Sequence, residues 1–356
     1  MLTVTRILQG IGASAIMSVT TALLRIIYPP QYIGRGMSIN AMVVAVSIAA
    51  GPSLAGAILS VASWNWLFAI NVPLGICAII TGYFLLPQNP CKDGPKRKFD
   101  KIGGISNALT FGLLIYSLEG IAHHENWRMI ALQVLLLLVI GTFFYPQATT
   151  AGGPILPLDL MRIPIFALSV LSSITSFTAQ LLAMVSLPFY LQNVAGRNEV
   201  ETGLLLTPWP VATILTAPVA GRLIEKYHPG LLGGIGMVVY ATGLLLLALL
   251  PGQPTNMDIA WRLMLCGMGF GLFQTPNNST MISAAPRSRS GGANGMQGTA
   301  RLLGQTLGTT FVALIFSVTS ATYSMPVCMY VAVGFALVAA IVSCLRISQP
   351  VPMRGR

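Results

Sequence analysis

The chain reads MSINAMVVAVSIAAGPSLAGAILSVASWNWLFAINVPLGICAIITGYFLLPQNPC from Met37 to Cys91, and none of these residues is charged. A helix needs roughly 20 mostly apolar residues to cross a bilayer about 30 Å thick, so this stretch is too long for one crossing. Its middle segment SVASWNWLF (60–68) carries paired tryptophans, which are typical of the membrane–water interface. The stretch therefore predicts two membrane-spanning helices joined by an interfacial turn.

The same pattern extends over all 356 residues, of which 54% are hydrophobic and 8% are charged, against about 25% charged in soluble domains. This composition excludes a soluble or a disordered chain, and we predict an all-α polytopic membrane protein with about eleven transmembrane helices. The predicted helices lie near 7–27, 37–59, 67–86, 102–122, 129–147, 166–191, 203–221, 231–250, 263–284, 302–320 and 326–345.

Basic residues give the chain an orientation in the membrane. The formal net charge is +11, and most of the 20 Lys and Arg residues fall in alternate loops, above all in CKDGPKRKFDK (91–101). Basic loops of this kind stay in the cytoplasm, so we expect a cytoplasmic C-terminus and no nucleic-acid partner. An odd number of helices would leave Met1 outside without a signal, and we therefore expect the chain to begin partway through a larger protein.

No constellation for catalysis or metal binding is evident. The five cysteines include no CxxC pair, which gives no disulfide framework or zinc site. His123 and His124 precede Glu125, but two adjacent ligands without a third cluster do not make a metal site. No nucleophile–base pair or phosphate-binding loop occurs. We expect neither an enzyme nor a metalloprotein, and the many Gly- and Pro-interrupted helices favour a transporter.

Three ordered motifs point to one family. They are Arg6-Ile-Leu-Gln-Gly10-Ile-Gly, then Gly51-Pro52-Ser-Leu-Ala-Gly56, and the run WNWLFAINVPLG (64–75). Together they resemble the major facilitator superfamily, specifically its fourteen-span drug:proton antiporter branch of the Emr/Qac type. The first is similar to that branch's fourth-span motif and the second to its fifth-span antiporter motif. One departure is Ala55 beside Gly56, where the family usually has two glycines.

The resemblance continues to the C-terminus. Asp100-x-x-Gly103, Pro218-x-x-Gly221-Arg222 and Gly298-x-x-Arg301-x-x-Gly304 look like later parts of the family. It implies the major facilitator fold, with this chain holding spans four to fourteen. The implied division is 1–90 for the last three spans of the N-terminal bundle, 91–101 for a basic cytoplasmic loop, 102–147 for two extra linker spans, 148–163 for a cytoplasmic loop, 164–347 for a C-terminal six-helix bundle and 348–356 for a cytoplasmic tail.

The function that the resemblance implies is proton-coupled export of amphipathic or cationic drugs by alternating access. The energy would come from a proton gradient without a cofactor, in a bacterial inner membrane, and a periplasmic adaptor cannot be inferred from the sequence. The coupling and gating residues implied are Arg6, Gly10, Gly51, Pro52, Gly56, Gly221, Arg222, Glu225 and Arg301. Arg6 could instead extend to the interface, and Arg222 and Glu225 could instead form a solvated helix end.

Two further sets of residues each have two possible interpretations. Glu119 is a candidate for protonation inside the membrane, or else an interfacial carboxylate. A substrate cavity could be lined by Phe177, Met184, Tyr190, Trp209 and Phe273, although such side chains more often face lipid or pack in a core. Rival functions are an importer of a small solute on the same fold, or a fragment that cannot transport because three spans are missing.

Overall fold

The computed structural model describes residues 2–29, 65–86 and 158–349, except 253, 287 and 288, together with isolated positions between 32 and 63 and between 109 and 135. Within these residues the chain is helical and contains no strand. Most of the predicted helices at 37–59, 102–122 and 129–147 fall outside the described residues. The all-helical fold class is confirmed by the described part.

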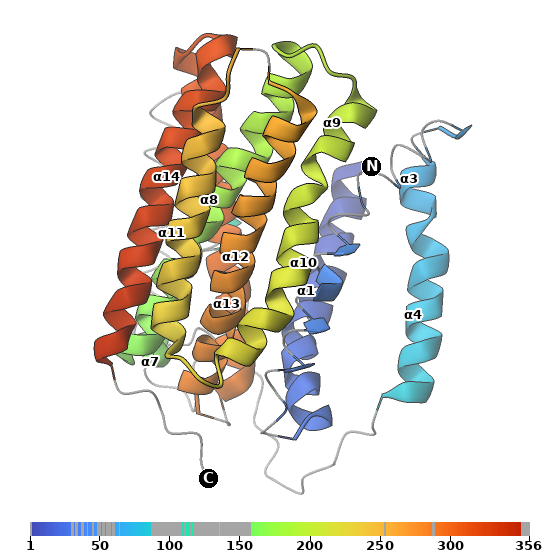
Figure 1. Cartoon of the computed structure of the whole chain (residues 1–356). Helices are drawn as coiled ribbons and strands as arrows, with labels where there is room; N and C mark the ends of the chain where they lie inside the picture. Colours follow the sequence, from blue (N-terminus) through green and yellow to red (C-terminus); the bar gives the residue numbers. More distant parts are fainter. Residues whose placement is uncertain are drawn as a thin grey trace, which may run out of the picture.

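A bundle formed by the C-terminal half dominates the structure (Figure 1). Short helix α7 (Leu158–Met161) leads into α8 (Pro164–Asn193), and α9 (Glu199–Leu206) is followed almost directly by α10 (Pro208–Leu223). The other members are α11 (Pro229–Ala248), α12 (Asn256–Ala284), α13 (Ser290–Val318) and α14 (Ala321–Leu345), which ends in the 3-10 turn η3 (Arg346–Ser348).

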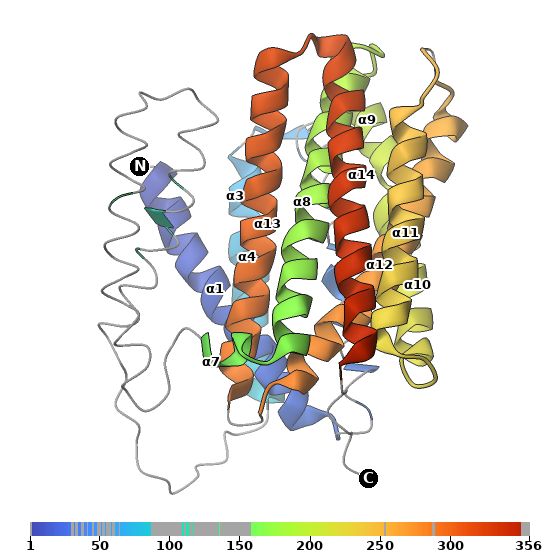
Figure 2. The same ribbon diagram turned by 90° about the vertical axis from the view of Figure 1, so that its left-hand side faces the viewer.

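The N-terminal helices stand beside this bundle (Figures 1 and 2). Helix α1 (Leu2–Ile27) contacts α13, whereas α3 (Trp66–Ala69) and α4 (Asn71–Leu85) contain no buried residue. The side chains of α4 are thus exposed on all sides although the helix is apolar.

Six described helices are long and apolar enough to cross a membrane: Trp66–Leu85, Pro164–Asn193, Val200–Leu223, Pro229–Ala248, Gly291–Val318 and Thr322–Ser348. They agree with predicted spans to within a few residues at most ends, and α13 begins earlier than expected. Helices α1 and α12 have 26 and 29 residues, a length that also suffices to cross a bilayer. Polar side chains such as Gln274 and Asn277 interrupt α12, which explains why it is less apolar than its neighbours.

Glycines bring α12 into close contact with two neighbours. A Cβ atom at Gly267 would overlap the main-chain carbonyl of Trp209 on α10, and one at Gly269 would overlap the main-chain amide of Tyr240 on α11. Without a hydrophobic force between helices in lipid, small residues that permit backbone contact are a main source of packing energy. Gly267 and Gly269 therefore set the distance between α12 and its neighbours.

Apolar side chains in the bundle form two separate clusters. We call the end of the bundle at which α8 begins and α14 ends the lower end, as it is drawn in Figure 1. The upper cluster follows α8 from Phe177 to Leu191 and includes buried side chains of α9 to α14. The lower cluster contains Leu160, Ile165, Phe166, Val170, Met281, Ala284, Ala285, Ala293, Met296 and Ala300. A polar layer therefore lies between them on α8 and α12.

Hydroxyl groups fill and border that layer on α8, and most of them bond within the helix itself. Ser169 Oγ donates to the carbonyl of Ile165 over 2.7 Å, and Thr175 and Thr178 donate likewise to carbonyls four residues earlier. All three side chains are buried. Bonds of this type satisfy a hydroxyl without requiring a partner on another helix.

Candidate functional site

The predicted gate segment lies where α10 ends at the lower end of the bundle. Gly221 and Arg222 form the last turn of α10, and Glu225 lies in the turn that follows Leu223. The side chains of Arg222 and Glu225 are exposed, and they form no ion pair with each other in the structure. A backbone hydrogen bond of 3.2 Å from Glu225 N to Arg222 O links the two residues. Both charges are therefore available to groups on other segments.

His228 connects this gate segment to the bundle interior. Its Nδ1 accepts a hydrogen bond of 3.0 Å from the Gly230 amide and so caps the first turn of α11. Partial burial, and secondarily the positive charge of Arg346, lower the pKa of His228 below its usual value. The imidazole is accordingly neutral at physiological pH, which its role as hydrogen-bond acceptor requires.

Arg6 lies on the exposed surface of α1. Its Nη1 donates to Gln9 Oε1 over 3.0 Å, and its guanidinium carbon is 4.7 Å from the ring centroid of Phe68 on α3. A cation over an aromatic ring is stabilised by the ring quadrupole, so Arg6 links α1 to the start of the next described helix pair. Gly10, one turn further along, has open space beside it.

The structure describes only some of the other predicted coupling residues. Gly51 is exposed with open space around it, whereas Pro52, Gly56 and Glu119 lie outside the described residues. Arg301 is partly buried on α13. One turn later, the carbonyl of Gly304 accepts a hydrogen bond of 3.1 Å from Thr178 on α8. Arg301 thus lies on the helix that contacts both α1 and α8.

The predicted cavity residues lie inside the bundle. Phe177, Tyr190, Trp209 and Phe273 are buried in the upper cluster, and Met184 packs against it. The rings of Phe177, Trp209 and Phe273 belong to one aromatic chain that also includes Tyr240 and Phe270. The centroid distances are 5.6 Å from Phe177 to Phe270, 5.7 Å from Phe270 to Tyr240, 5.5 Å from Tyr240 to Trp209 and 6.4 Å from Phe270 to Phe273. This placement matches the packing alternative, and a substrate role for these residues stays a prediction.

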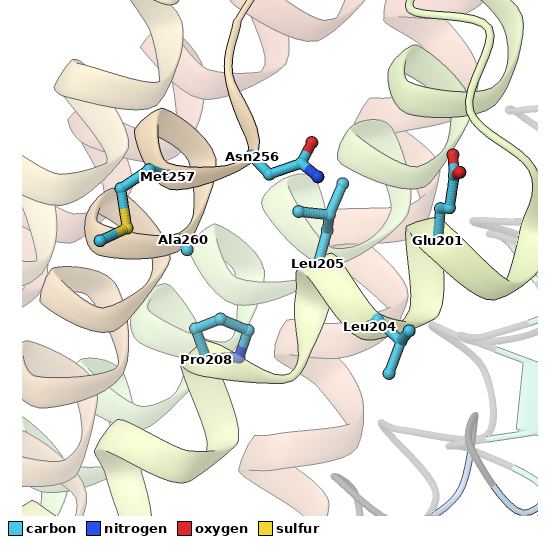
Figure 3. Close-up of a pocket in the computed structure, with 7 residues that line it drawn as sticks. All are labelled: Glu201, Leu204, Leu205, Pro208, Asn256, Met257 and Ala260. Carbon is cyan, nitrogen blue, oxygen red and sulfur yellow. The ribbon is translucent and has the colours of Figure 1, made fainter.

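A cavity of about 310 Å³ opens elsewhere, near the upper end of the bundle between α9, α10 and α12 (Figure 3). None of the predicted residues lines it. Its lining is mostly apolar, with one carboxylate from Glu201, and consists of Glu201, Leu204, Leu205, Pro208, Asn256, Met257 and Ala260.

Sequence reasoning missed a buried group of polar residues at the lower end. We name it the polar cluster: Ser169, Ser173, Asn277, Ser343 and Arg346. Arg346 is only 1% exposed. Its Nη1 donates to Asn277 Oδ1 over 2.6 Å and to Ser169 Oγ over 3.0 Å, and Nη2 donates to Ser343 Oγ.

The polar cluster extends to two further contacts. Asn277 Nδ2 donates to Ser173 Oγ over 2.7 Å, and Ser343 Oγ donates to the carbonyl of Gly230 on α11 over 3.0 Å. The cluster therefore connects four helices, α8, α11, α12 and α14. A signal for it exists in the sequence: a dense run of hydroxyls from Ser169 to Thr178, and an asparagine directly after Pro276 inside a predicted span.

The apolar crossing helices and the proline-interrupted bundle define a polytopic membrane carrier. The sequence matches the Major Facilitator Superfamily over residues 1–309. The chain belongs to this superfamily and is an integral membrane transporter.

Three relatives illustrate the similarity. The chain is 54% identical over 350 residues to the uncharacterized transporter YebQ of Escherichia coli (strain K12), covering 98% of this chain and 76% of that protein. It is 29% identical over 317 residues to the tetracenomycin C resistance and export protein of Streptomyces glaucescens, covering 88% and 58%. It is 27% identical over 320 residues to the riboflavin transporter RibZ of Clostridioides difficile (strain 630), covering 90% and 68%.

Proposed function

We propose that this chain belongs to a proton-coupled exporter of amphipathic or cationic compounds that works by alternating access. The observation that carries the proposal is the similarity to a resistance and export protein over 88% of the chain. The antiporter-like sequence from Gly51 to Gly56 adds support. A helix with a proline among small residues can pack closely and seal one face of a carrier. We propose neither enzymatic chemistry nor a cofactor.

The proposal includes the fourteen-span arrangement and its orientation. The region 102–147 would supply the two extra spans, 164–347 the C-terminal bundle, and 91–101 with 148–163 the cytoplasmic loops. The lower end of the C-terminal bundle would then face the cytoplasm of a bacterial inner membrane. The distribution of basic residues supports this orientation.

The test uses the product of the whole gene in inverted membrane vesicles from a strain without other exporters. Addition of a cationic or amphipathic drug to acidified vesicles should release protons from the lumen, measured with a pH-sensitive dye. Uptake of drug into the same vesicles should stop when an ionophore dissipates the gradient. Vesicles containing vector membranes are the control. Drug uptake that persists without a gradient would contradict proton coupling.

A second candidate is an importer of a small solute. The similarity to a riboflavin transporter favours it, because that relative covers 90% of this chain. Whole cells distinguish the two functions. An importer raises the amount of labelled flavin inside cells, whereas an exporter lowers the amount of labelled drug. Flavin accumulation without drug efflux would replace the first proposal.

The exposed position of Glu225 leads to a prediction about the gate. If Glu225 exchanges ionic partners as the two bundles rock, Glu225→Gln should lower the rate of drug efflux at unchanged membrane abundance. We expect a loss of about tenfold, equivalent to roughly 1.4 kcal/mol in the barrier. The matched control is Glu225→Asp, which keeps a carboxylate at the same exposed position and should keep most of the efflux. Equal efflux from Glu225→Gln and the unmodified protein would remove the gate role.

A further inference from the structure

We propose that Arg346 is a positioning residue of the transport cycle: it fastens the lower part of α12 to α8 and α14, so that the bundle below Pro276 moves as one body. This inference rests on the proposed function, because it assigns a role within the movement of a carrier. It concerns a residue that the sequence places among ordinary basic loop residues at the end of the last helix.

The first support is the charge of Arg346. Its side chain is buried, and its described partners are neutral: Ser169, Asn277 and the side chain and carbonyl of Ser343. Burying a guanidinium costs free energy, and well-packed apolar residues often stabilise a fold as well or better. What an arginine adds at this position, beyond any effect on stability, is a directional connection among three helices.

The second support is a missing backbone hydrogen bond in α12 directly above the attachment point. Pro276 lies inside the helix and has no amide hydrogen, so the helix lacks one backbone hydrogen bond at this turn. Asn277, the next residue, is the one that accepts the 2.6 Å bond from Arg346. The attachment therefore begins at the first residue beyond the weakest point of the helix.

The third support is the different surroundings of the two halves of α12. Above Pro276, Gly267 and Gly269 fit against the backbones of α10 and α11. Below it, Asn277 bonds to α8 and α14, and Met281 belongs to the lower cluster. The apolar core consists of two separate clusters, one on each side of this level. The helix can therefore bend at Pro276 while the packing within each cluster stays intact.

Hydrogen exchange of the purified protein in lipid nanodiscs tests the fastening without a substrate. Arg346→Gln removes hydrogen bonds donated by a buried charged group, so exchange of amides 277–284 should become faster by at least about tenfold. Amides 263–272 on the same helix should not change. Arg262→Gln, at the upper end of α12, is the control. No change at 277–284, or an equal rise along all of α12, would overturn the proposal.

A second variant covers the case in which Arg346→Gln does not fold. Asn277→Asp places a carboxylate where the amide oxygen now accepts from Arg346. The bonds donated by Asn277 Nδ2 are lost, but the Ser173 hydroxyl can turn to donate to the carboxylate, and the new ion pair with Arg346 should tighten the attachment. We expect slower exchange at 277–284 and a lower maximal transport rate with an unchanged KM. Slower exchange with an unchanged transport rate would show that the fastening plays no part in the cycle. If the unmodified protein transports no compound, the proposed function fails, while the exchange data still decide the fastening.

Discussion

Gly269→Ala should strongly destabilise the bundle, because the added methyl group would force two helix backbones apart. The new Cβ would overlap the main-chain amide of Tyr240, which cannot move as a flexible side-chain end could. Overpacking of a close contact costs about 1–3 kcal/mol, and here two helix backbones must separate. The measurement is the midpoint of thermal unfolding in detergent. Unfolding is monitored as the loss of the monodisperse peak in size-exclusion chromatography.

The control for this prediction is Gly295→Ala on α13. Gly295 is also helical, but no atom lies within 4 Å of an added Cβ. Alanine favours a helix over glycine by roughly 0.5–1 kcal/mol, so this variant should be as stable as the parent or more so. If Gly269→Ala unfolds at the same temperature as Gly295→Ala, the close contact of α12 with α11 does not determine stability.

Cysteine labelling in intact cells should give an all-or-none difference between the two ends of α11. Glu225 lies in the turn before α11 and Gly252 lies in the connection after it, so they occupy opposite ends of the bundle. In a background without native cysteines, an impermeant maleimide should label Gly252→Cys and not Glu225→Cys. Both positions are exposed, which removes burial as a reason for unequal labelling.

Permeabilised cells provide the control for the topology, because both cysteines should then react. The reverse result in intact cells, with only Glu225→Cys labelled, would show that the orientation is opposite to the one that the positive-inside rule predicts. The gate at Glu225 would then face outward, and the lower end of the bundle with it.

Helices were predictable from sequence where apolar runs are long. The structure places α8 at Pro164–Asn193 against a predicted span of 166–191, and α14 at Ala321–Leu345 against 326–345. Both predictions rest on the length and composition of an apolar run, which can be read directly from the sequence. The early start of α13 at Ser290 was missed, because its first turns are polar and rich in glycine and do not resemble a membrane span.

Side-chain placement was much less predictable. In a sequence, an aromatic residue such as Trp209 is compatible with a binding cavity and with a packed core. The structure distinguishes the two, because it places the ring of Trp209 against the ring of Tyr240 on a neighbouring helix. The placement of a charged side chain was equally hard to predict, as Arg346 shows. Its position at the end of a span suggested a loop residue, but the acceptors Ser169 and Asn277 come from helices far away in the sequence.

The hydroxyls of α8 that bond within their own helix have a consequence for the order of synthesis. Ser169, Thr175 and Thr178 are synthesised early, and the distant partners of Ser169 and Thr178 on α12, α13 and η3 follow more than 100 residues later. A polar side chain that waits in lipid without a partner would cost free energy, yet these hydroxyls already have an acceptor four residues earlier. These three hydroxyls of α8 can therefore enter the bilayer already bonded, before the asparagine of α12 and the arginine of η3 join the helix.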